Sequence, residues 1–379
     1  MSFVYKPPTE WIPPDSFPTE KLCQATEIAI DLETRDPSLK ELGPGYIRGD
    51  GEVVGISFAI DGYEDYFPFA HEQGFNFSKK KVIEFTKKIC ATDSDKIFHN
   101  SSYDVGWLTR EGVPINGRII DTMVVAPLID ENQYWYSLNA LGREYINEGK
   151  TEGELNAAAE EWGLDPKAEM WRLPSAYVGT YATQDAALTL KLWNHFKILL
   201  EEQNLWNVFD LEMRVLPVIL AMKQKGVRVD TDRAQSLKKQ LIKREKDIVQ
   251  QIKDESGVPE LQLWAANSLA KVFDAMNLTY LRTPTGMPSF TKAFLENHSH
   301  PIANLIREAR EVNKTHSTFI DSILKHAHNG RIHAEIRQLK GESGGTVTGR
   351  LSMSNPNLQQ VPARNKEIGP LIRSLFLPE

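Results

Sequence analysis

The sequence lacks the features that mark secreted, disulfide-stapled and membrane-spanning proteins. Only two of its 379 residues are cysteine, Cys23 and Cys90, too few for a disulfide framework and, by themselves, for a structural zinc site. No apolar run approaches the roughly 20 residues of a membrane span. Residues 1–20 are interrupted by prolines rather than arranged as a signal peptide. Since 25% of the residues are charged and 41% hydrophobic, disorder is excluded as well. We expect a folded protein of a reducing, cytoplasmic compartment with no membrane partner.

Negative charge is concentrated in one part of the chain. Residues 1–200 contain 19 Lys and Arg against 31 Asp and Glu, whereas residues 201–379 contain 25 against 20. An excess of carboxylates disfavours general nucleic-acid binding by the first half, but it suits a site in which carboxylates surround metal ions. The basic second half could offer contacts to phosphates. The asymmetry predicts two parts with different functions, within the two or three domains expected at this length.

Residues 21–200 are expected to form a mixed sheet with helices packed on it. In the first strand the apolar residues alternate with others, so that Ile28, Ile30 and Leu32 share one face. Asp61-Gly62 is typical of a hairpin turn between the second and third strands. The pattern predicts further strands at residues 53–60, 66–69, 96–99 and 119–120, and helices at residues 79–89 and 102–110. A β meander followed by alternating α and β elements indicates an α/β fold.

The rest of the chain is expected to be mainly helical and then to change character. Apolar residues at three-, four- and seven-residue steps predict a long amphipathic helix across residues 234–252, with a basic outer face. Further elements are predicted in chain order: helices at residues 205–225, 268–276 and 301–327, a loop at 283–288, a strand-like segment at 332–339 and a polar loop at 341–362.

Two carboxylates on one strand form the first candidate for a chemical site. Asp31 and Glu33 lie two residues apart and therefore on the same face, opposite the apolar face of the strand. Two carboxylates held this close repel each other unless a cation or a proton intervenes, so the pair suggests a metal platform. For the pair alone, a solvated strand face remains the open alternative.

Three further residues extend this pair into an ordered set. Asp104 is expected in the first turn of a helix that follows a strand, where a carboxylate can reach over the strand ends. Tyr181 and Asp185 are four residues apart and share one face of a later helix. Taken singly, these could be an acid favoured by the helix dipole and an ordinary core aromatic. Asp121, by contrast, is interpreted as structural, because its position predicts a helix cap.

In chain order the set resembles the motifs of the 3′–5′ proofreading exonucleases, in which a tyrosine joins four carboxylates on a ribonuclease-H-like fold. The three motifs in this chain are Asp31-x-Glu33, Asn100-x-x-x-Asp104 and Tyr181-x-x-x-Asp185. The histidine-containing variant of the family would need a histidine where Thr180 stands, so the tyrosine class fits better. The resemblance implies removal of mismatched nucleotides from a single-stranded 3′ end of DNA.

The resemblance also implies a role for each residue of the set. Asp31 would bridge two divalent ions, and Asp104 would hold the second of them. Glu33 and Asp185 would complete the site of the ion that activates water. Tyr181, together with Glu33, would orient the attacking water.

The chemistry of phosphodiester hydrolysis explains these residue types. The reaction needs an activated water, an in-line attack and charge relief on the leaving 3′ oxygen, and two divalent ions about 3.5–4 Å apart supply all three. Hard oxygen ligands select Mg²⁺ or Mn²⁺ over zinc, which agrees with carboxylates and no Cys/His cluster in the sequence. We therefore expect two Mg²⁺ ions, with Mn²⁺ as the alternative. Asn100 is expected to contact the terminal nucleotide.

The second half carries the most specific string of the chain. Thr-Gly-Arg-Leu-Ser at residues 348–352, followed by residues 355–362, closely resembles the entry into the palm of the family A DNA polymerases. Residues 211–214 and 226–230 resemble the start of the thumb of the same family. The resemblance thus runs over nearly the whole chain, from about residue 26 to its end.

Four polar residues of this string are expected to hold a DNA duplex. Arg350 can reach a phosphate or a minor-groove acceptor, and Gln359 can follow the minor-groove edge without reading sequence. Ser352 and Asn357 offer neutral hydrogen bonds. Without the resemblance, a polar loop whose arginine is merely solvated would be the favoured interpretation.

The resemblance leaves two explanations for the extent of the chain. The chain ends before the motif that carries the first polymerase metal-binding Asp, so we expect no polymerase activity from it alone. It is either an excised fragment or the N-terminal half of a polymerase encoded in two pieces. In the second case a complementary C-terminal chain would pair with the edge of a partial palm sheet. No 5′-nuclease domain precedes the exonuclease part, which looks most like a phage-type replicative polymerase in a bacterial or phage-infected host cytoplasm.

Four regions are predicted: an extended lead-in at residues 1–20, a 3′–5′ exonuclease domain at 21–200, a helical thumb at 201–330 and the start of a palm at 331–379. The predicted function is proofreading of DNA, with the second half holding the primer–template duplex. Two alternatives stay open. The string at residues 348–352 disfavours a stand-alone 3′–5′ exoribonuclease of the same fold. The complete set of five site residues disfavours a non-catalytic DNA-binding or assembly subunit.

Overall fold

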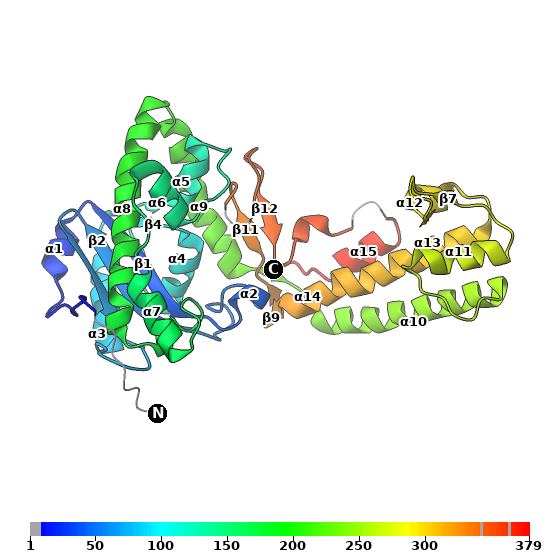
Figure 1. The fold of residues 1–379 in the computed structure, drawn as a ribbon, viewed down its shortest axis with the longest axis horizontal. Coiled ribbons are helices and arrows are strands. Elements are labelled where there is room, and N and C mark those ends of the chain that lie inside the picture. The colour runs from blue at the N-terminus through cyan, green and yellow to red at the C-terminus, as the bar shows by residue number, and fades with distance from the viewer. Residues whose placement is uncertain (1–8, 342–343, 363–364) are drawn as a thin grey trace. The chain divides into compact units, whose positions relative to one another are not determined.

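The computed structural model describes residues 9–341, 344–362 and 365–379, and the chain divides into two compact units. Unit 1 comprises Met1–Lys225 and Ala334–Ser354, and unit 2 comprises Gly226–His333 and Asn355–Glu379. The chain therefore passes from one unit to the other three times (Figure 1). These units are defined by their internal contacts, so the fourfold division into functional regions stays a prediction. Residues 1–8 of the predicted lead-in lie outside the described residues.

Unit 1 is built on a mixed five-stranded sheet of order β3-β2-β1-β4-β5. The strands are β1 Glu27–Arg35, β2 Glu52–Ile60, β3 Tyr63–Pro68, β4 Asp95–Phe98 and β5 Ile119–Asp121. The meander β1-β2-β3 is antiparallel, whereas β4 and β5 join β1 in parallel. Gly62 forms the predicted hairpin turn with a φ of 71°, a conformation that glycine adopts without strain. The expected mixed sheet is confirmed, and β3 begins three residues earlier than its prediction.

Helices cover this sheet. Those of unit 1 are α1 Thr19–Gln24, α2 Leu39–Leu42, α3 Lys79–Cys90, α4 Ser101–Arg110, α5 Thr122–Ile129, α6 Leu138–Ile146, α7 Gly153–Trp162, α8 Gly179–Glu202 and α9 Trp206–Lys225, with 3₁₀ turns at Met170–Arg172 and Ser175–Tyr177. The 24-residue helix α8 runs across the sheet and contacts β1, β2, β3 and β4 (Figure 1). Helix α8 therefore brings its own side chains over the central strand of the sheet.

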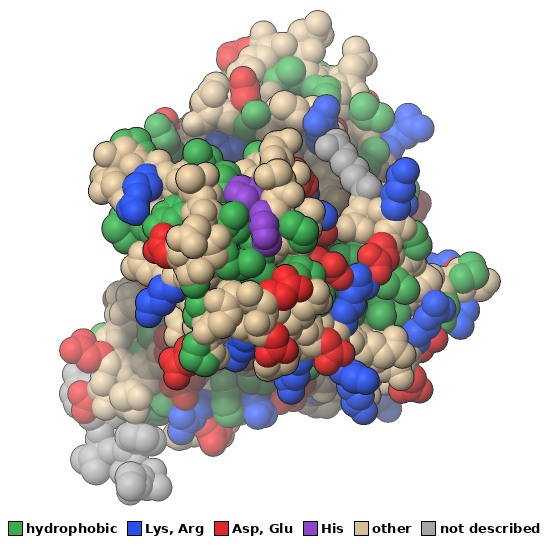
Figure 2. Space-filling model, turned by 90° about the vertical axis from the view of Figure 1, so that its right-hand side faces the viewer, with side chains coloured by type: hydrophobic (Ala, Val, Ile, Leu, Met, Phe, Trp, Pro, Cys, Tyr) green, Lys and Arg blue, Asp and Glu red, His purple; other side chains and the backbone are tan. Residues whose placement is uncertain are grey.

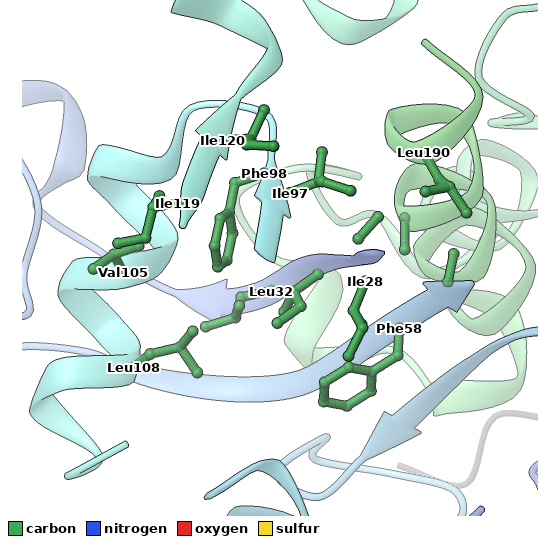
Figure 3. Packing of buried hydrophobic residues seen from close by; sticks show 14 of the residues in the cluster. Ile28, Leu32, Phe58, Ile97, Phe98, Val105, Leu108, Ile119, Ile120 and Leu190 are labelled. Atoms are coloured by element: carbon green, nitrogen blue, oxygen red, sulfur yellow. The ribbon is translucent and has the colours of Figure 1, made fainter. Parts of the chain in front are cut away.

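The core of unit 1 lies between the sheet and its helices. Apolar side chains from β1, β2, β4, β5, α4 and α8 pack together there (Figure 3). Ile28, Phe58 and Ile97 are completely buried, and burying a side chain of this size stabilises the fold by about 1.5–3 kcal/mol. Leu32 and Leu108 are buried in the same cluster, so the predicted apolar face of β1 is confirmed. This packing fixes the position of β1, whose opposite face carries the candidate carboxylates.

The strand-like segment predicted at residues 332–339 is two strands that pair in different units. β10 Arg331–Ile332 pairs in unit 2 with β6 Val227–Arg228 and β9 Ala327–His328. β11 Glu335–Arg337 pairs in unit 1 with β12 Ser352–Ser354. The prediction of one strand is wrong because the chain changes its pairing partner between them. The predicted polar loop at 341–362 correspondingly contains β12 and the 3₁₀ turn Leu358–Gln360.

Unit 2 is mainly helical. Its longer elements are α10 Thr231–Ser256, α11 Ala266–Ala275, α12 Lys292–Asn297, α13 Pro301–Lys314, α14 Asp321–His326 and α15 Ile368–Arg373, and β7 Leu281–Arg282 pairs with β8 Pro288–Ser289. The apolar stripe of α10 is buried in the core of this unit, with Leu241 and Ile252 packed in one cluster with Ile306 of α13. Acidic and basic side chains are interspersed over the face that Figure 2 shows. The predicted long amphipathic helix is confirmed.

The helix predicted at residues 301–327 is interrupted after α13. A π-helical turn, Thr315–Ile320, separates α13 from α14. The Thr315 hydroxyl donates to the Glu311 carbonyl oxygen at 2.6 Å, and the Ser317 hydroxyl donates to that of Asn313 at 2.8 Å. Such side-chain bonds compete with the regular backbone ladder and widen the helix, which apolar periodicity does not reveal. No helix of the described residues is long and apolar enough to cross a membrane.

Candidate metal centre

Strand β1 holds two of the predicted ligands over the sheet. Asp31 pairs with Ser57 of β2, whose hydroxyl donates to the Asp31 carbonyl oxygen at 3.2 Å. The register of β1 against β2 shifts between Glu33 and Thr34, directly after the second carboxylate. A bulge of this kind bends a strand and redirects the side chains beside it. Asp31 and Glu33 thus project from one face of the central strand, just before the bulge.

Helix α8 brings a third carboxylate to the same place. Ligand atoms of Asp31, Glu33 and Asp185 all lie within 4.8 Å of one another. Asp185 is 3% exposed and Glu33 is 6% exposed. Two oxygens of this cluster, Glu33 Oε1 and Asp185 Oδ1, are buried without a hydrogen-bond partner among the described residues. Unpartnered carboxylate oxygens are costly in a protein interior and mark a place that a cation would fill.

The pKa shifts of the cluster also indicate that it needs a compensating cation. Burial, and then the charge of Asp185, raise the pKa of Asp31 from 3.8 to about 8. Burial and the neighbouring charge of Asp31 hold the pKa of Glu33 well above its ordinary range. The cluster is therefore fully ionised near neutral pH only when a positive charge compensates it. Three oxygen-bearing groups fit a hard divalent ion such as Mg²⁺ or Mn²⁺.

The fourth predicted ligand stands beside the cluster. Asp104 lies in the first turn of α4 and is 4% exposed. It is outside the group of three, yet burial and then the charge of Asp31 raise its pKa well above the ordinary range. The charges of Asp121 and Glu33 raise the pKa of Asp104 further, so its carboxyl group feels both the cluster and the β4–α4 junction.

Tyr181 completes the predicted set on the same face of α8. Its side chain is 8% exposed, and Lys150 Nζ donates to its hydroxyl oxygen at 3.2 Å. Burial, and then the charge of Asp185, raise the pKa of Tyr181 well above its ordinary range. The shift favours the protonated hydroxyl, which can donate a hydrogen bond.

Asn100 and Asp121 form the junction between β4 and α4. Asn100 precedes α4 with a φ of 75°, and its side chain is exposed. The Asp121 carboxylate accepts from the backbone N–H groups of Asn100 at 3.0 Å and Ser101 at 2.7 Å, and from that of Met123 at 2.9 Å. The last bond caps α5, so the interpretation of Asp121 as a helix cap is confirmed.

One residue beside the carboxylates, Lys150, was not predicted from the sequence. Lys150 lies between α6 and α7, and its ammonium group donates to Asp185 Oδ2 as well as to the Tyr181 hydroxyl. A lysine in an irregular segment has no periodicity to mark it, and 35 residues separate it from Asp185. Only the folded chain brings it to the carboxylates.

The predicted duplex-binding residues are divided between the units. Arg350 and Ser352 belong to unit 1, whereas Asn357 and Gln359 belong to unit 2. Arg350, Asn357 and Gln359 are exposed, and Ser352 is half-buried on β12. Asn357 Oδ1 accepts from the Gln359 backbone N–H at 3.0 Å, which shapes the turn that carries both side chains. The roles of these four residues stay predictions.

Two protein families account for most of the chain. Residues 18–201 match the 3′–5′ exonuclease family, and residues 231–379 match DNA polymerase family A. The chain belongs to the family A DNA polymerases and contains their exonuclease domain together with the first part of their polymerase domain. The expected family is thereby confirmed.

Relatives among phage proteins match nearly the whole chain. The chain is 34% identical over 398 residues to a DNA-directed DNA polymerase of Pseudomonas phage M6, covering 100% of this chain and 60% of that protein. It is 33% identical over 383 residues to the DNA polymerase DpoZ of Acinetobacter phage SH-Ab 15497, covering 94% of this chain and 59% of that protein. The chain thus spans about 60% of the length of these curated relatives.

A solved structure shares the fold. The POL domain of Pol1 from M. smegmatis, in complex with DNA primer-template and dNTP, superimposes with a TM-score of 0.71 at 20% identity. The match covers 95% of this chain and 56% of that one. The likeness agrees with the expected mixed α/β fold, a sheet covered by helices.

Proposed function

We propose that unit 1 removes nucleotides from the 3′ end of DNA by metal-dependent phosphodiester hydrolysis. The observation that carries this proposal is the cluster of half-buried Asp31 with buried Glu33 and Asp185, in which two carboxylate oxygens have no hydrogen-bond partner among the described residues. The cluster lies in a domain of the 3′–5′ exonuclease family. Buried, unpaired carboxylates destabilise a fold, and a catalytic metal site gives a reason to keep them.

The residues present fit a pair of divalent ions. Asp31, Glu33 and Asp185 would hold one ion, and Asp104, beside Asp31, would contribute to the second. When bound, Mg²⁺ or Mn²⁺ supplies an activated water and neutralises charge on the leaving 3′ oxygen. Tyr181, which keeps its proton, would donate a hydrogen bond that orients the attacking water. Tyr181 stands four residues before Asp185, on the same face of α8, which supports this role.

Binding of DNA forms the second part of the proposal. Asn100 is exposed where β4 meets α4 and would contact the terminal nucleotide. Arg350, Ser352, Asn357 and Gln359 would hold the primer–template duplex. The M. smegmatis Pol1 structure of the same fold contains a DNA primer-template, which supports DNA as the partner. We infer that the reaction proofreads newly made DNA in the cytoplasm of a bacterium or a phage-infected host.

DNA synthesis is proposed only for an assembly that supplies the rest of the polymerase domain. The chain spans about 60% of its phage relatives, and we propose a complementary C-terminal chain as the partner. Primer extension by the 379-residue chain is expected to fail alone and to appear when that chain is added. If the complementary C-terminal chain neither binds this chain nor restores primer extension, the two-chain proposal is contradicted. The favoured explanation is then that the 379 residues are a fragment of a longer polymerase.

A degradation assay tests the nuclease proposal directly. The chain is incubated with 5′-labelled single-stranded DNA and Mg²⁺, beside Asp31→Asn, Asp185→Asn and Glu202→Gln. Glu202 is an exposed carboxylate at the end of the same helix as Asp185 and serves as the matched control. We expect stepwise shortening from the 3′ end that EDTA and both Asp variants abolish and Glu202→Gln retains.

The same assay separates the alternatives. Faster shortening of a matched RNA than of DNA would favour the stand-alone exoribonuclease. No shortening of either substrate, alone or with the complementary chain, would favour a non-catalytic DNA-binding or assembly subunit. Shortening that survives both Asp31→Asn and Asp185→Asn would place the activity outside this cluster.

A further inference from the structure

The carboxylate cluster already contains one positive charge from the chain itself. The ammonium group of Lys150 donates to Asp185 Oδ2 and to the hydroxyl oxygen of Tyr181, and it lies 5.0 Å from the centre of the Tyr181 ring. The Lys150 side chain is 17% exposed, against 4% for that of Asp185. One oxygen of Asp185 is therefore taken by lysine, while Asp185 Oδ1 and Glu33 Oε1 have no partner among the described residues.

The backbone on either side of Lys150 is fixed to the site. Gln184, the neighbour of Asp185 on α8, donates to the Gly149 carbonyl oxygen at 3.0 Å and accepts from the Thr151 N–H. The Lys150 N–H donates to Asn139 Oδ1 of α6 at 2.9 Å. Three hydrogen bonds thus anchor the backbone at Lys150, and its ammonium group is joined to this anchor by a four-carbon side chain.

Gly149 leaves room for this anchoring. A Cβ atom at Gly149 would lie 2.9 Å from Asn139 Oδ1 and 2.8 Å from Arg143 Nε, closer than real side chains come. The segment therefore follows a path that places a lysine backbone against α6 and α8. Such a path is a built feature of the site, and it determines where the ammonium group can reach.

The ammonium group is held by charge. Its contact with Asp185 is an ion pair, formed at a carboxylate that is only 4% exposed. The ion pair uses negative charge that a divalent ion would also need, because Asp185 belongs to the only group of three ligands found among the described residues. A lysine and a metal ion cannot both take the full negative charge of the cluster.

We propose that Lys150 is a displaceable cation of this site, which competes with the divalent ion for Asp185 and, once displaced, pairs with a phosphate of the 3′-terminal DNA. This inference rests on the proposed nuclease function for the phosphate but not for the competition. The anchored backbone keeps the displaced ammonium beside the cluster, and phosphate is the anion that such a substrate brings there.

Metal binding without DNA tests the competition. Mn²⁺ is titrated calorimetrically into the chain, into Lys150→Met, which keeps the apolar stem, and into Lys150→Arg, which keeps the charge. The matched control is Lys191→Met, because Lys191 pairs with Glu148 of the same segment at 2.7 Å and its side chain is 55% exposed. We expect the Mn²⁺ dissociation constant to fall about tenfold in Lys150→Met. In Lys191→Met it should be unchanged, and in Lys150→Arg it should stay close to that of the unsubstituted chain. An unchanged constant in Lys150→Met would overturn the competition.

The unsubstituted chain offers a second measurement that does not depend on a variant folding. An amine-reactive ester modifies accessible lysines, and peptide mass spectrometry measures the extent at Lys150 and Lys191. Because displacement frees the ammonium group, Mn²⁺ is expected to increase modification of Lys150 several-fold and to leave Lys191 unaffected. Protection of Lys150 by Mn²⁺, or no change, would refute displacement.

The kinetics separate this inference from the proposed function. With single-stranded DNA and saturating Mn²⁺, Lys150→Met is expected to raise KM about tenfold, with Lys150→Arg close to the unsubstituted chain. Tighter Mn²⁺ binding with no DNA shortening by any protein would sustain the competition and defeat the nuclease. DNA shortening with Mn²⁺ affinity independent of Lys150 would sustain the nuclease and defeat the competition.

Discussion

Replacing Asp31 by asparagine should stabilise the metal-free chain while removing its response to metal. The pKa of Asp31 is raised from 3.8 to about 8, first by burial and then by the charge of Asp185. A folded-state pKa above the unfolded one means that the native chain binds more protons, so this group costs stability as pH rises from about 4 to about 8. Each tenfold change in protonation is worth about 1.4 kcal/mol, which gives an upper limit of about 5–6 kcal/mol above pH 8.

Relaxation of the neighbouring groups reduces this figure. The Lys150 ammonium already compensates part of the charge, so we expect Asp31→Asn to gain about 2–4 kcal/mol of unfolding free energy at pH 8 in EDTA. Mg²⁺ at 100 times its dissociation constant should stabilise the unsubstituted chain by about 2.7 kcal/mol and leave the variant unchanged. Mg²⁺ thus reduces or cancels the difference in unfolding free energy between the unsubstituted chain and Asp31→Asn.

Urea unfolding followed by tryptophan fluorescence measures both quantities. Seven of the eight tryptophans lie in unit 1, so the signal reports mainly on the unit that holds the cluster. The control is Glu202→Gln, which changes an exposed carboxylate on α8 and should fall within about 0.5 kcal/mol of the unsubstituted chain. An Asp31→Asn variant that is no more stable in EDTA, or that Mg²⁺ stabilises as much as it does the unsubstituted chain, would refute the reasoning.

Three further predictions concern groups outside the cluster. Burial lowers the pKa of His71, which bonds the Tyr66 hydroxyl at 2.8 Å, from 6.5 to about 4. The neutral form of His71 therefore contributes stability that is fully present above pH 6.5 and is lost as the pH falls through 4. In urea titrations at a series of pH values, His71→Gln should remove about 2–3 kcal/mol of this change in unfolding free energy. An unfolding free energy that depends on pH as steeply as in the unsubstituted chain would contradict the prediction. Asp121→Ala should cost about 1–3 kcal/mol because three backbone N–H groups lose their acceptor, a loss that thermal melting would detect and Asp121→Asn should partly restore. Lys223→Met should lower the unfolding free energy by about 3 kcal/mol because Glu335, its partner at 2.7 Å, loses this ion pair. Adding Glu335→Gln to this variant should recover part of the lost stability. If the two substitutions act additively in a double-mutant cycle, the two residues are not coupled.

The regular parts of the fold and site could be read from the sequence because they depend on periodicity. Alternation in β1 places Asp31 and Glu33 on one face, and a four-residue step places Tyr181 and Asp185 on one face of α8. That these elements meet is implied by the resemblance to the exonuclease motifs, and the structure places ligand atoms of Asp31, Glu33 and Asp185 within 4.8 Å of one another.

The unpredicted features depend on contacts that periodicity does not encode. Lys150 reaches Asp185 through a segment whose path is set by side-chain bonds from Asn139 and Gln184. The π-helical turn Thr315–Ile320 follows from hydroxyl bonds to the backbone rather than from an apolar pattern. The separate strands β10 and β11 depend on pairing partners far along the chain.

The interleaving of the two units has a consequence for dissecting the protein. Because the chain crosses between units after residues 225, 333 and 354, no single cleavage yields two intact halves. Removing residues 331–379 would take β11 and β12 away from unit 1, and Glu335 with them. The 2%-exposed Lys223 side chain would then keep its charge in the interior without that carboxylate. A stable exonuclease piece requires residues 334–354 to be rejoined behind residue 225 through a linker, as a spliced rather than a truncated polypeptide.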